Sequence, residues 1–413
     1  MNPSFLVVAD GHCTSPAGWR AAGVVCGLKR SGAEDLALLL SDHPAVAAAA
    51  FTANAFAAAP VQYDRDLLAA GRPVRAVLVN SGCANACTGP KGLEDARAMA
   101  RLAEQTLGLD EGEVLISSTG RIGVHLPMEK IQRGVELAKA ALAPDGGAAA
   151  ARAIMTTDTR PKNLAVSLIV DGREVRIGGM TKGAGMIAPR MKPLREPQAT
   201  MLAYLTTDAV VTPDFLQLCL NRSLDASFNR ITVDGDTSTN DTFLALANGA
   251  AGNRPLDARH PDAAAFQAAF TFVAGRLARE MVLDGEGVTR FVELVVSGAK
   301  DDAEARKCAE SIANSLLVKT AWFGADPNWG RILCAAGYSG VALNPDQVAL
   351  DYGDTPIVRH GQDSGVPEAE QAEAIRKREF QIRLDLGAGP GAFTIWTCDL
   401  SYDYVKINAD YHT

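Results

Sequence analysis

The sequence has little of what marks membrane proteins and nucleic-acid-binding proteins. Its most apolar stretch, residues 45–59, is rich in alanine and interrupted by Thr52 and Asn54, so it is too short and too weakly apolar to span a bilayer. The formal net charge of −8 and the lack of a basic cluster argue against nucleic acid as the main partner. We therefore expect neither a membrane nor a nucleic acid among the partners of this 413-residue chain.

Paired cysteines and metal-binding spacings are also missing. Cys83 and Cys87 are separated by three residues, but no second pair and no nearby histidine accompany them, so a zinc site is not expected. The other cysteines are scattered, which is typical of reduced thiols in the cytoplasm. Residues 1–10 lack the basic segment that opens a secretory signal. The sequence thus predicts a cytoplasmic protein.

No motif for a phosphate-bearing cofactor occurs. There is no Walker pattern, and no G-x-G-x-x-G opens a helix after a strand. Residues 234–241, DGDTSTND, look at first like a calcium loop, but they lack the spacing and the final glutamate of an EF-hand. The sequence therefore predicts no metal and no cofactor.

Aromatic residues are sparse at 6%, whereas apolar residues of all kinds make up 47% of the chain. This composition favours an α/β fold of close-packed layers, and the length allows two or three domains. The hydrophobic periodicity predicts helices at 93–107, 130–143, 213–225, 262–281, 301–319 and 368–378. It predicts strands within 17–40 and at 74–80, 113–118, 164–170, 174–177, 201–205, 290–296 and, last, 381–386. Asp171-Gly172 predicts a tight hairpin turn.

Thr200 stands at a sharp change in the character of the sequence. A glycine-rich stretch that carries Lys182 precedes it, a polar segment follows that stretch, and an apolar run begins at Met201. A threonine hydroxyl is a weak nucleophile unless a base stands beside it, and a threonine at a chain N-terminus can use its own amine, whose pKa is roughly 7.7–8.0. Thr200 would acquire such an amine only by cleavage after Ala199. Without cleavage, Ala199-Thr200 is an ordinary junction between a loop and a strand.

Two further positions carry chemistry that the local sequence leaves open. Thr119 and Gly120 follow a predicted strand, where a hydroxyl and a backbone N–H can form an oxyanion hole or simply a turn. Glu286 stands between two glycines after a predicted helix. It can face the amine of a ligand, or it can be a solvated turn residue.

Several motifs resemble those of the ornithine acetyltransferases, the bifunctional glutamate N-acetyltransferase family of arginine biosynthesis. They are FTAN at 51–54, STGRIG at 118–123, AIMTTDTRPK at 153–162, KGAGMIAP at 182–189, ATMLAYLTTDA at 199–209 and GADPNWGRIL at 324–333. The resemblance spans essentially the whole chain. One departure is that nine residues, RMKPLREPQ, stand between Pro189 and Ala199 where the family usually has two. Their charges and two prolines predict a solvated loop at 190–198.

The resemblance implies a layered N-terminal-nucleophile fold that cleaves itself between Ala199 and Thr200. The fragments 1–199 and 200–413 would remain together, as a heterotetramer of two copies of each. It also implies acetyl transfer from N2-acetylornithine to glutamate through acetyl-Thr200, with Thr119 and Gly120 stabilising the oxyanion. No metal or redox cofactor is implied, and acetyl-CoA as a second donor stays open.

The residues that would contact substrate, by resemblance, are Thr159, Lys182, Thr200, Glu286, Asn408 and Thr413. Thr156 and Thr157 are close enough to Thr159 to leave that choice open. One alternative function is an N-terminal-nucleophile amidohydrolase or aminopeptidase of related architecture, in which water takes the acyl group. The other is an uncleaved, inactive precursor, which the long 190–198 segment motivates.

Overall fold

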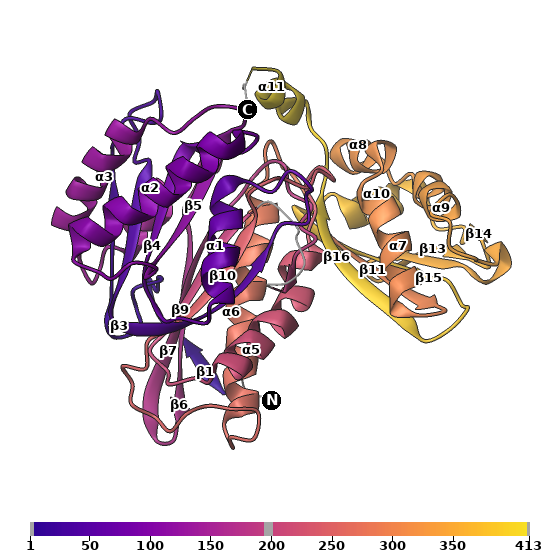
Figure 1. The fold of residues 1–413 in the computed structure, drawn as a ribbon. Helices are drawn as coiled ribbons and strands as arrows, with labels where there is room; N and C mark the ends of the chain where they lie inside the picture. Colours follow the sequence, from indigo (N-terminus) through magenta and orange to yellow (C-terminus); the bar gives the residue numbers. More distant parts are fainter. Residues whose placement is uncertain (1–3, 194–200, 411–413) are drawn as a thin grey trace. The chain divides into compact units, whose positions relative to one another are not determined.

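The computed structural model describes residues 4–193 and 201–410, which form two compact units (Figure 1). The first unit comprises the chain up to Asn229 together with Thr237–Met281. The second unit comprises Arg230–Asp236 and the chain from Val282 onward.

The predicted segments 1–199 and 200–413 divide the chain differently from these units. The first unit contains residues from both segments, and strands from both segments share its sheet. Ala199, Thr200 and Thr413, to which the sequence analysis assigns functions, lie outside the described residues.

The first unit is built on a large sheet whose strands follow the order β1-β6-β7-β9-β10-β3-β4-β5, with β2 and β8 also paired to β3. The strands are β1 (Phe5–Val7), β2 (Trp19–Val24), β3 (Leu36–Phe51), β4 (Val74–Cys83), β5 (Val114–Arg121), β6 (Lys162–Val170), β7 (Arg173–Lys182), β8 (Lys192–Pro193), β9 (Leu202–Thr207) and β10 (Thr242–Ala247).

The long strand β3 divides this sheet into two layers. Its first half pairs with β2 and β4, its second half pairs with β10, and the β4 register shifts between Leu40 and Ala45. Such an irregularity bends a strand. Side chains from both layers of the sheet meet in one apolar cluster. Leu39 and Leu115 come from the layer of β4 and β5, and Tyr204 and Leu244 come from the layer of β9 and β10. The core of the unit therefore lies between two sheet layers.

Helices cover the outer faces of the two layers (Figure 1). Residues of α2 and α3 pack with those of β3, β4 and β5 in a second apolar cluster. On α5 and α6, Phe215, Phe266 and Phe270 form a ladder of ring contacts that reaches Phe243 of β10. The helices are α1 (Ala59–Ala69), α2 (Gly89–Leu107), α3 (Met128–Ala140), α4 (Gly147–Ala153), α5 (Pro213–Ala226) and α6 (Ala263–Leu283). The predicted layered α/β class is confirmed.

The second unit has its own sheet, with the order β14-β13-β12-β15-β11-β16. Its strands are β11 (Phe291–Ala299), β12 (Ala349–Tyr352), β13 (Thr355–Arg359), β14 (Gln362–Asp363), β15 (Glu379–Asp385) and β16 (Gly391–Cys398). Its helices are α7 (Asp302–Ala313), α8 (Leu316–Gly324), α9 (Trp329–Gly337), α10 (Glu368–Ile375) and α11 (Tyr402–Asp410). The short 3₁₀ helices of the chain are η1 (Phe228–Arg230) and η2 (Pro345–Gln347).

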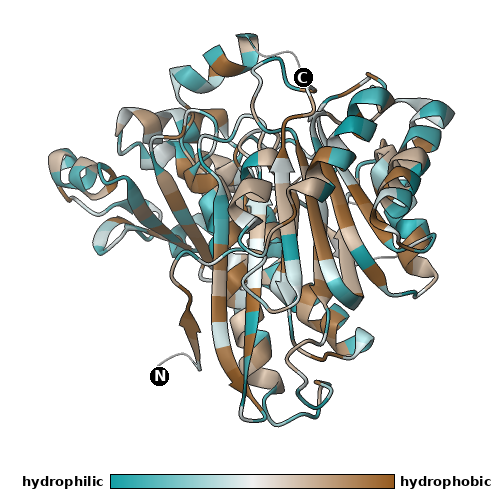
Figure 2. Ribbon diagram, turned by 90° about the vertical axis from the view of Figure 1, so that its left-hand side faces the viewer, coloured by the Kyte–Doolittle hydropathy of each residue, from teal (hydrophilic) through white to brown (hydrophobic). Residues whose placement is uncertain are grey.

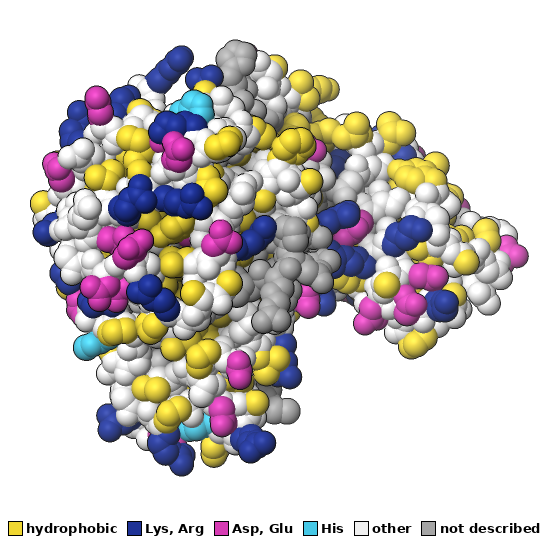
Figure 3. All heavy atoms as spheres, viewed as in Figure 1, with side chains coloured by type: hydrophobic (Ala, Val, Ile, Leu, Met, Phe, Trp, Pro, Cys, Tyr) yellow, Lys and Arg dark blue, Asp and Glu magenta, His cyan; other side chains and the backbone are white. Residues whose placement is uncertain are grey.

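Local sequence signals set several of these elements. Strands β6 and β7 pair around Asp171 and Gly172, whose φ values of 50° and 72° suit the predicted hairpin turn. Helix α5 begins at Pro213 after Thr212, as predicted. Hydrophobic residues concentrate along the strands, while hydrophilic residues cover the outer sides of many helices (Figure 2). On the face drawn in Figure 3, basic and acidic side chains are interspersed. Within the described ranges, no helix is both long enough and apolar enough to cross a membrane.

Three predictions about elements are wrong. The single helix expected at 301–319 is two helices, because the Ser315 hydroxyl accepts the Val318 N–H and starts α8 anew. The strand β15 is not the last one, since β16 and α11 follow it. The segment 190–198 is not wholly a solvated loop: Met191 is buried, its N–H donates to the Asn229 side chain, and β8 pairs with β3.

Candidate active site

Lys182 brings two threonines together in the first unit. It is the last residue of β7, not part of the glycine-rich loop, and its side chain is buried. Its ammonium donates to the hydroxyl of Thr156 at 2.8 Å and to that of Thr119 at 3.3 Å. A lysine ammonium donates and cannot accept, so the Thr119 hydroxyl proton stays available for another acceptor. The structure thus joins Thr119 and Lys182, two of the predicted residues.

Thr119 and Gly120 lie near the end of β5, beside Ser81 and Gly82 of β4. Gly120 has a φ of +127°, in a region that L side chains rarely adopt. A Cβ at this position would lie 2.5 Å from the Gly82 carbonyl carbon, so the close approach of the two backbones requires glycine. The strand end therefore presents a hydroxyl with a fixed backbone beside it, which is what an oxyanion hole needs.

The structure distinguishes the threonines of the TTDT motif. Thr156 is partly buried and accepts from Lys182, whereas Thr159 is exposed. Spacing alone could not rank these hydroxyls, because all of them lie in a short connection between α4 and β6. Thr156 is thus a functional candidate that the sequence analysis left undecided.

Asp158 lies beneath this cluster and was missed by sequence reasoning. Its carboxylate accepts the Lys162 ammonium at 2.6 Å and the Gly183 N–H at 2.7 Å through one oxygen. Its other oxygen accepts the Thr156 N–H at 3.0 Å. These bonds connect it to Thr156 and to the residue that follows Lys182.

Asp241 is a second acid that the sequence analysis did not single out. It precedes β10, and the next residue, Thr242, donates its N–H to the carbonyl of Met201. Neither carboxylate oxygen of Asp241 has a hydrogen-bond partner among the residues that the structure describes, and the residue is fully buried. Burial raises the pKa of Asp241 well above its ordinary value, although the charge of Lys182 opposes this rise. The Asp241 carboxyl therefore holds its proton more tightly than an exposed aspartate does.

In the second unit, the predicted residues Glu286 and Asn408 are in direct contact. The Asn408 side-chain amide donates to a Glu286 carboxylate oxygen at 2.7 Å and to the Tyr404 carbonyl at 3.0 Å. Glu286 is only 7% exposed, so the solvated-turn alternative is wrong. Gly287 follows with a φ of +66°, and a Cβ there would lie 2.6 Å from the Ser401 hydroxyl oxygen. Close packing of this turn against the start of α11 therefore fixes Glu286.

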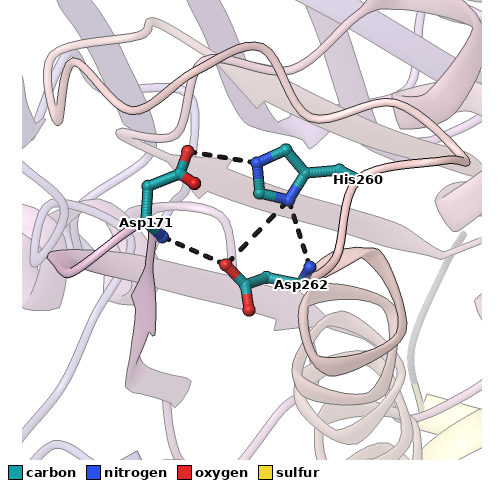
Figure 4. A group of neighbouring side chains, drawn as sticks. All are labelled: Asp171, His260 and Asp262. Atoms are coloured by element: carbon teal, nitrogen blue, oxygen red, sulfur yellow. Dashed lines mark hydrogen bonds and ion pairs between the residues drawn. The ribbon is translucent and has the colours of Figure 1, made fainter.

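A group of possible metal ligands lies elsewhere in the first unit, at the β6–β7 turn (Figure 4). The His260 Nε2 donates to an Asp171 carboxylate oxygen over 3.1 Å, and its Nδ1 accepts the Asp262 N–H at 3.1 Å. Arg254 pairs with Asp171 at 2.5 Å, and its hydrogen bond is the main reason that the pKa of Asp171 falls to about 2. Both imidazole nitrogens of His260 and the Asp171 carboxylate already have partners. These contacts therefore connect the hairpin turn to the chain ahead of α6.

Comparison with known proteins gives one consistent result. The family model described as the ArgJ family matches residues 20–413. The arginine biosynthesis bifunctional protein ArgJ of Geobacter sulfurreducens is 49% identical over 397 residues, covering 96% of this chain and 99% of that protein. The protein of the same name from Thermosynechococcus vestitus is 47% identical and covers 98% of each chain. A solved ArgJ chain from Bacillus halodurans is 43% identical, with a TM-score of 0.50, and covers 51% of this chain and 100% of that chain.

Proposed function

The chain belongs to the ArgJ family, and on that basis we propose that it transfers an acetyl group from N2-acetylornithine to glutamate. The products are ornithine and N-acetylglutamate, and the enzyme is an acyltransferase of arginine biosynthesis. The observation that carries this proposal is the contact of Lys182 with the hydroxyls of Thr119 and Thr156, in a chain that matches its named relatives over nearly its whole length. A cytoplasmic location belongs to the same proposal.

The nucleophile is produced by self-cleavage. The Thr200 hydroxyl attacks the Ala199 carbonyl carbon, the peptide C–N bond breaks as the Thr200 nitrogen takes a proton, and water then hydrolyses the resulting ester. The freed amine becomes the general base for the hydroxyl of the same residue. In support, the solved Bacillus halodurans chain is matched over its full length by 51% of this chain, which is close to the share of residues 200–413.

The two fragments have a physical reason to stay together after cleavage. Strand β7 belongs to segment 1–199 and pairs with β9 of segment 200–413 from Ile177 to Lys182. Strand β3 of the first segment also pairs with β10 of the second. Both fragments therefore contribute strands to one sheet, and we propose a heterotetramer with two copies of each.

Transfer proceeds through an acetyl ester on Thr200. The hydroxyl attacks the acetyl carbonyl and gives its proton to the amine, and the oxyanion accepts the Thr119 O–H and the Gly120 N–H. Collapse of this intermediate breaks the amide bond, and the amine returns the proton to the leaving ornithine. The amine of glutamate then attacks the ester carbonyl carbon, the acyl C–O bond breaks as the Thr200 oxygen regains the proton that the glutamate nitrogen loses, and N-acetylglutamate leaves.

The charged residues Lys182 and Glu286 have distinct roles toward substrate. The Lys182 ammonium binds a substrate carboxylate and keeps the Thr119 hydroxyl oriented. Thr156 takes the contact that the resemblance assigned to Thr159, since it is the hydroxyl bonded to Lys182. Asn408 occupies one oxygen of Glu286 and leaves the other for a cationic amine of the substrate. Thr200 and Thr413 complete the substrate contacts that the family resemblance implies.

A second activity is favoured by the word "bifunctional" in the names of the relatives. We propose that the Thr200 hydroxyl also attacks the thioester of acetyl-CoA, that the acyl C–S bond breaks and CoA leaves as its thiol, and that glutamate then takes the acetyl group from Thr200. The product is again N-acetylglutamate, and no further catalytic residue is required.

Mass spectrometry of the purified protein tests the proposal directly. Wild-type protein is expected as two fragments, and N2-acetylornithine alone should add one acetyl mass to the 200–413 fragment. Glutamate should remove that mass, and Thr200→Ala should remain one unacetylated chain. Steady release of acetate without glutamate would favour the amidohydrolase alternative, and a wild-type chain that stays whole would favour the inactive precursor.

A further inference from the structure

Asp158 connects the two sides of the Lys182 environment. Through the Thr156 N–H it holds the residue whose hydroxyl accepts from Lys182. Through the Gly183 N–H it holds the residue immediately after Lys182. One buried carboxylate thus fixes both the backbone that carries the ammonium and the hydroxyl that receives its hydrogen bond.

The position of Gly183 leaves little freedom at this turn. Its φ is +148°, and a Cβ there would lie 2.6 Å from the Met281 methyl carbon and 2.7 Å from Ile187 Cδ1. The chain therefore turns after β7 with a backbone conformation that favours glycine, and a larger residue would have to displace the ends of the Met281 and Ile187 side chains. The bond from the Gly183 N–H to Asp158 sets where this turn begins, and with it the direction of Lys182.

The Asp158 carboxylate also offsets the positive charges of neighbouring lysine ammonium groups. Burial alone would raise the pKa of Asp158, but Lys162 and Lys182 outweigh burial and hold that pKa well below its ordinary value. The pKa of Lys29 is lowered, mainly by burial. The Asp35 carboxylate opposes this lowering, and the charge of Lys182 adds to it. Burial raises the pKa of Asp241, the other buried acid that Lys182 influences. The ionised carboxylate of Asp158 thus offsets the repulsion between neighbouring lysines.

We propose that Asp158 is a positioning residue for acetyl transfer, acting through Thr156, Gly183 and Lys182 without touching substrate. Lys162 completes the arrangement by holding one carboxylate oxygen in place. The inference rests on the proposed function of the same site. It assigns a task to the aspartate and the second lysine of the TTDTRPK segment.

The test must separate positioning from the stability of a buried ion pair. Asp158→Asn alone removes the carboxylate that faces Lys162, whose side chain is 1% exposed, so this variant is expected to melt at a lower temperature. The double variant Asp158→Asn/Lys162→Met removes both charges and should recover most of the melting temperature. If the pair only supports the fold, kcat recovers with it. If Asp158 positions Lys182, kcat of the processed double variant stays about 100-fold low, the loss expected for a small misplacement, while the KM values change far less.

A double-mutant cycle with Lys182 tests whether Asp158 affects kcat through Lys182. In a Lys182→Met background, the Asp158→Asn/Lys162→Met changes should cause little further loss, because their effect passes through the missing ammonium. Equal losses in both backgrounds would overturn the inference. Should a variant fail to cleave itself at unchanged stability, the rate of cleavage replaces kcat as the readout, because attack on the Ala199 carbonyl also forms a tetrahedral oxyanion, which the same pair of Thr119 and Gly120 would stabilise.

A matched control comes from α2, where Lys91 and Asp95 form a pair of the same i,i+4 spacing at 2.5 Å with a buried aspartate. Asp95→Asn/Lys91→Met should leave kcat and KM unchanged. A double variant at Asp158 and Lys162 that matches this control would also overturn the inference. If wild-type protein itself transfers no acetyl group from N2-acetylornithine to glutamate, the proposed function fails, and this outcome is visible before any variant is made.

Discussion

Asp64 offers a direct test of the electrostatics of the double-layered core. It lies on α1 with no exposed surface, and one of its oxygens accepts the Ile116 N–H at 2.9 Å. Within the described part of the chain, the other oxygen has no hydrogen-bond partner. Burial raises the pKa of Asp64 well above its ordinary value, and the Ile116 bond opposes this rise only in part.

The sign of the pH effect follows from proton counting. An unfolded aspartate has a pKa of about 3.9, so between that pH and the raised folded pKa the folded chain holds one proton more than the unfolded chain. The stability that Asp64 contributes is full below about pH 4 and falls as the pH rises toward the folded pKa. Within this window the free energy of unfolding drops by ~1.4 kcal/mol per pH unit because of this residue.

Asp64→Asn removes that dependence and keeps the acceptor for Ile116. Urea unfolding followed by far-UV circular dichroism at pH 5.5, 6.5 and 7.5 measures the free energy of unfolding of each variant. The difference between Asp64→Asn and wild type should shift in favour of the variant by ~1.4 kcal/mol for each pH unit that lies between the unfolded pKa and the raised folded pKa. Asp66→Asn, an exposed position on the same helix, should follow wild type at each pH. Parallel curves for Asp64→Asn and wild type would show that Asp64 is ionised in the folded protein and refute the reasoning.

Three further predictions concern the proposed site. Thr119→Ala should lower kcat by roughly ten- to a thousand-fold in steady-state assays of the processed enzyme, the range for one lost oxyanion donor, and unchanged kcat would remove Thr119 from the mechanism. Glu286→Ala should chiefly raise KM, because it removes binding that ground and transition states share, so a fall in kcat at constant KM would contradict its role. Deleting residues 194–198, which keeps β8, should change the rate of self-cleavage on denaturing gels more than kcat of fully processed enzyme. A large fall in kcat would instead place those residues in the active site.

Local patterns predicted many elements, because turns and helix starts depend on a few neighbouring residues. The β6–β7 hairpin follows from Asp171-Gly172, and the start of α5 follows from Thr212 and Pro213. The second half of β3 was not predicted, because its alanines have low strand propensity and gain their place only between the two layers. Strand pairing across the chain depends on contacts that periodicity does not contain.

The residues of the candidate site were likewise predicted only in part. Thr119, Lys182, Glu286 and Asn408 were predicted from motif resemblance, and the structure brings them together in two pairs, one in each unit. Thr156 could not be chosen over its neighbours, because sequence spacing does not reveal which hydroxyl faces Lys182. The signal for Asp158 was present, as an aspartate four residues before a lysine, but that spacing is common on exposed surfaces. Only burial distinguishes this pair from an ordinary one.

The shared sheet explains why a longer segment ahead of Thr200 is compatible with the proposed cleavage. In the uncut chain, residues 183–201 connect β7 to β9, and lengthening such a connection costs little, since each doubling of a loop adds only about 0.6 kcal/mol. Part of the extra length does not add to the free loop at all, because β8 pairs with β3. After cleavage the connection no longer exists, and the fragments are held by the pairing of β7 with β9 and of β3 with β10. We therefore expect the length of the segment to affect the proposed cleavage step, and the pairing of β7 with β9 and of β3 with β10 to hold the fragments afterwards.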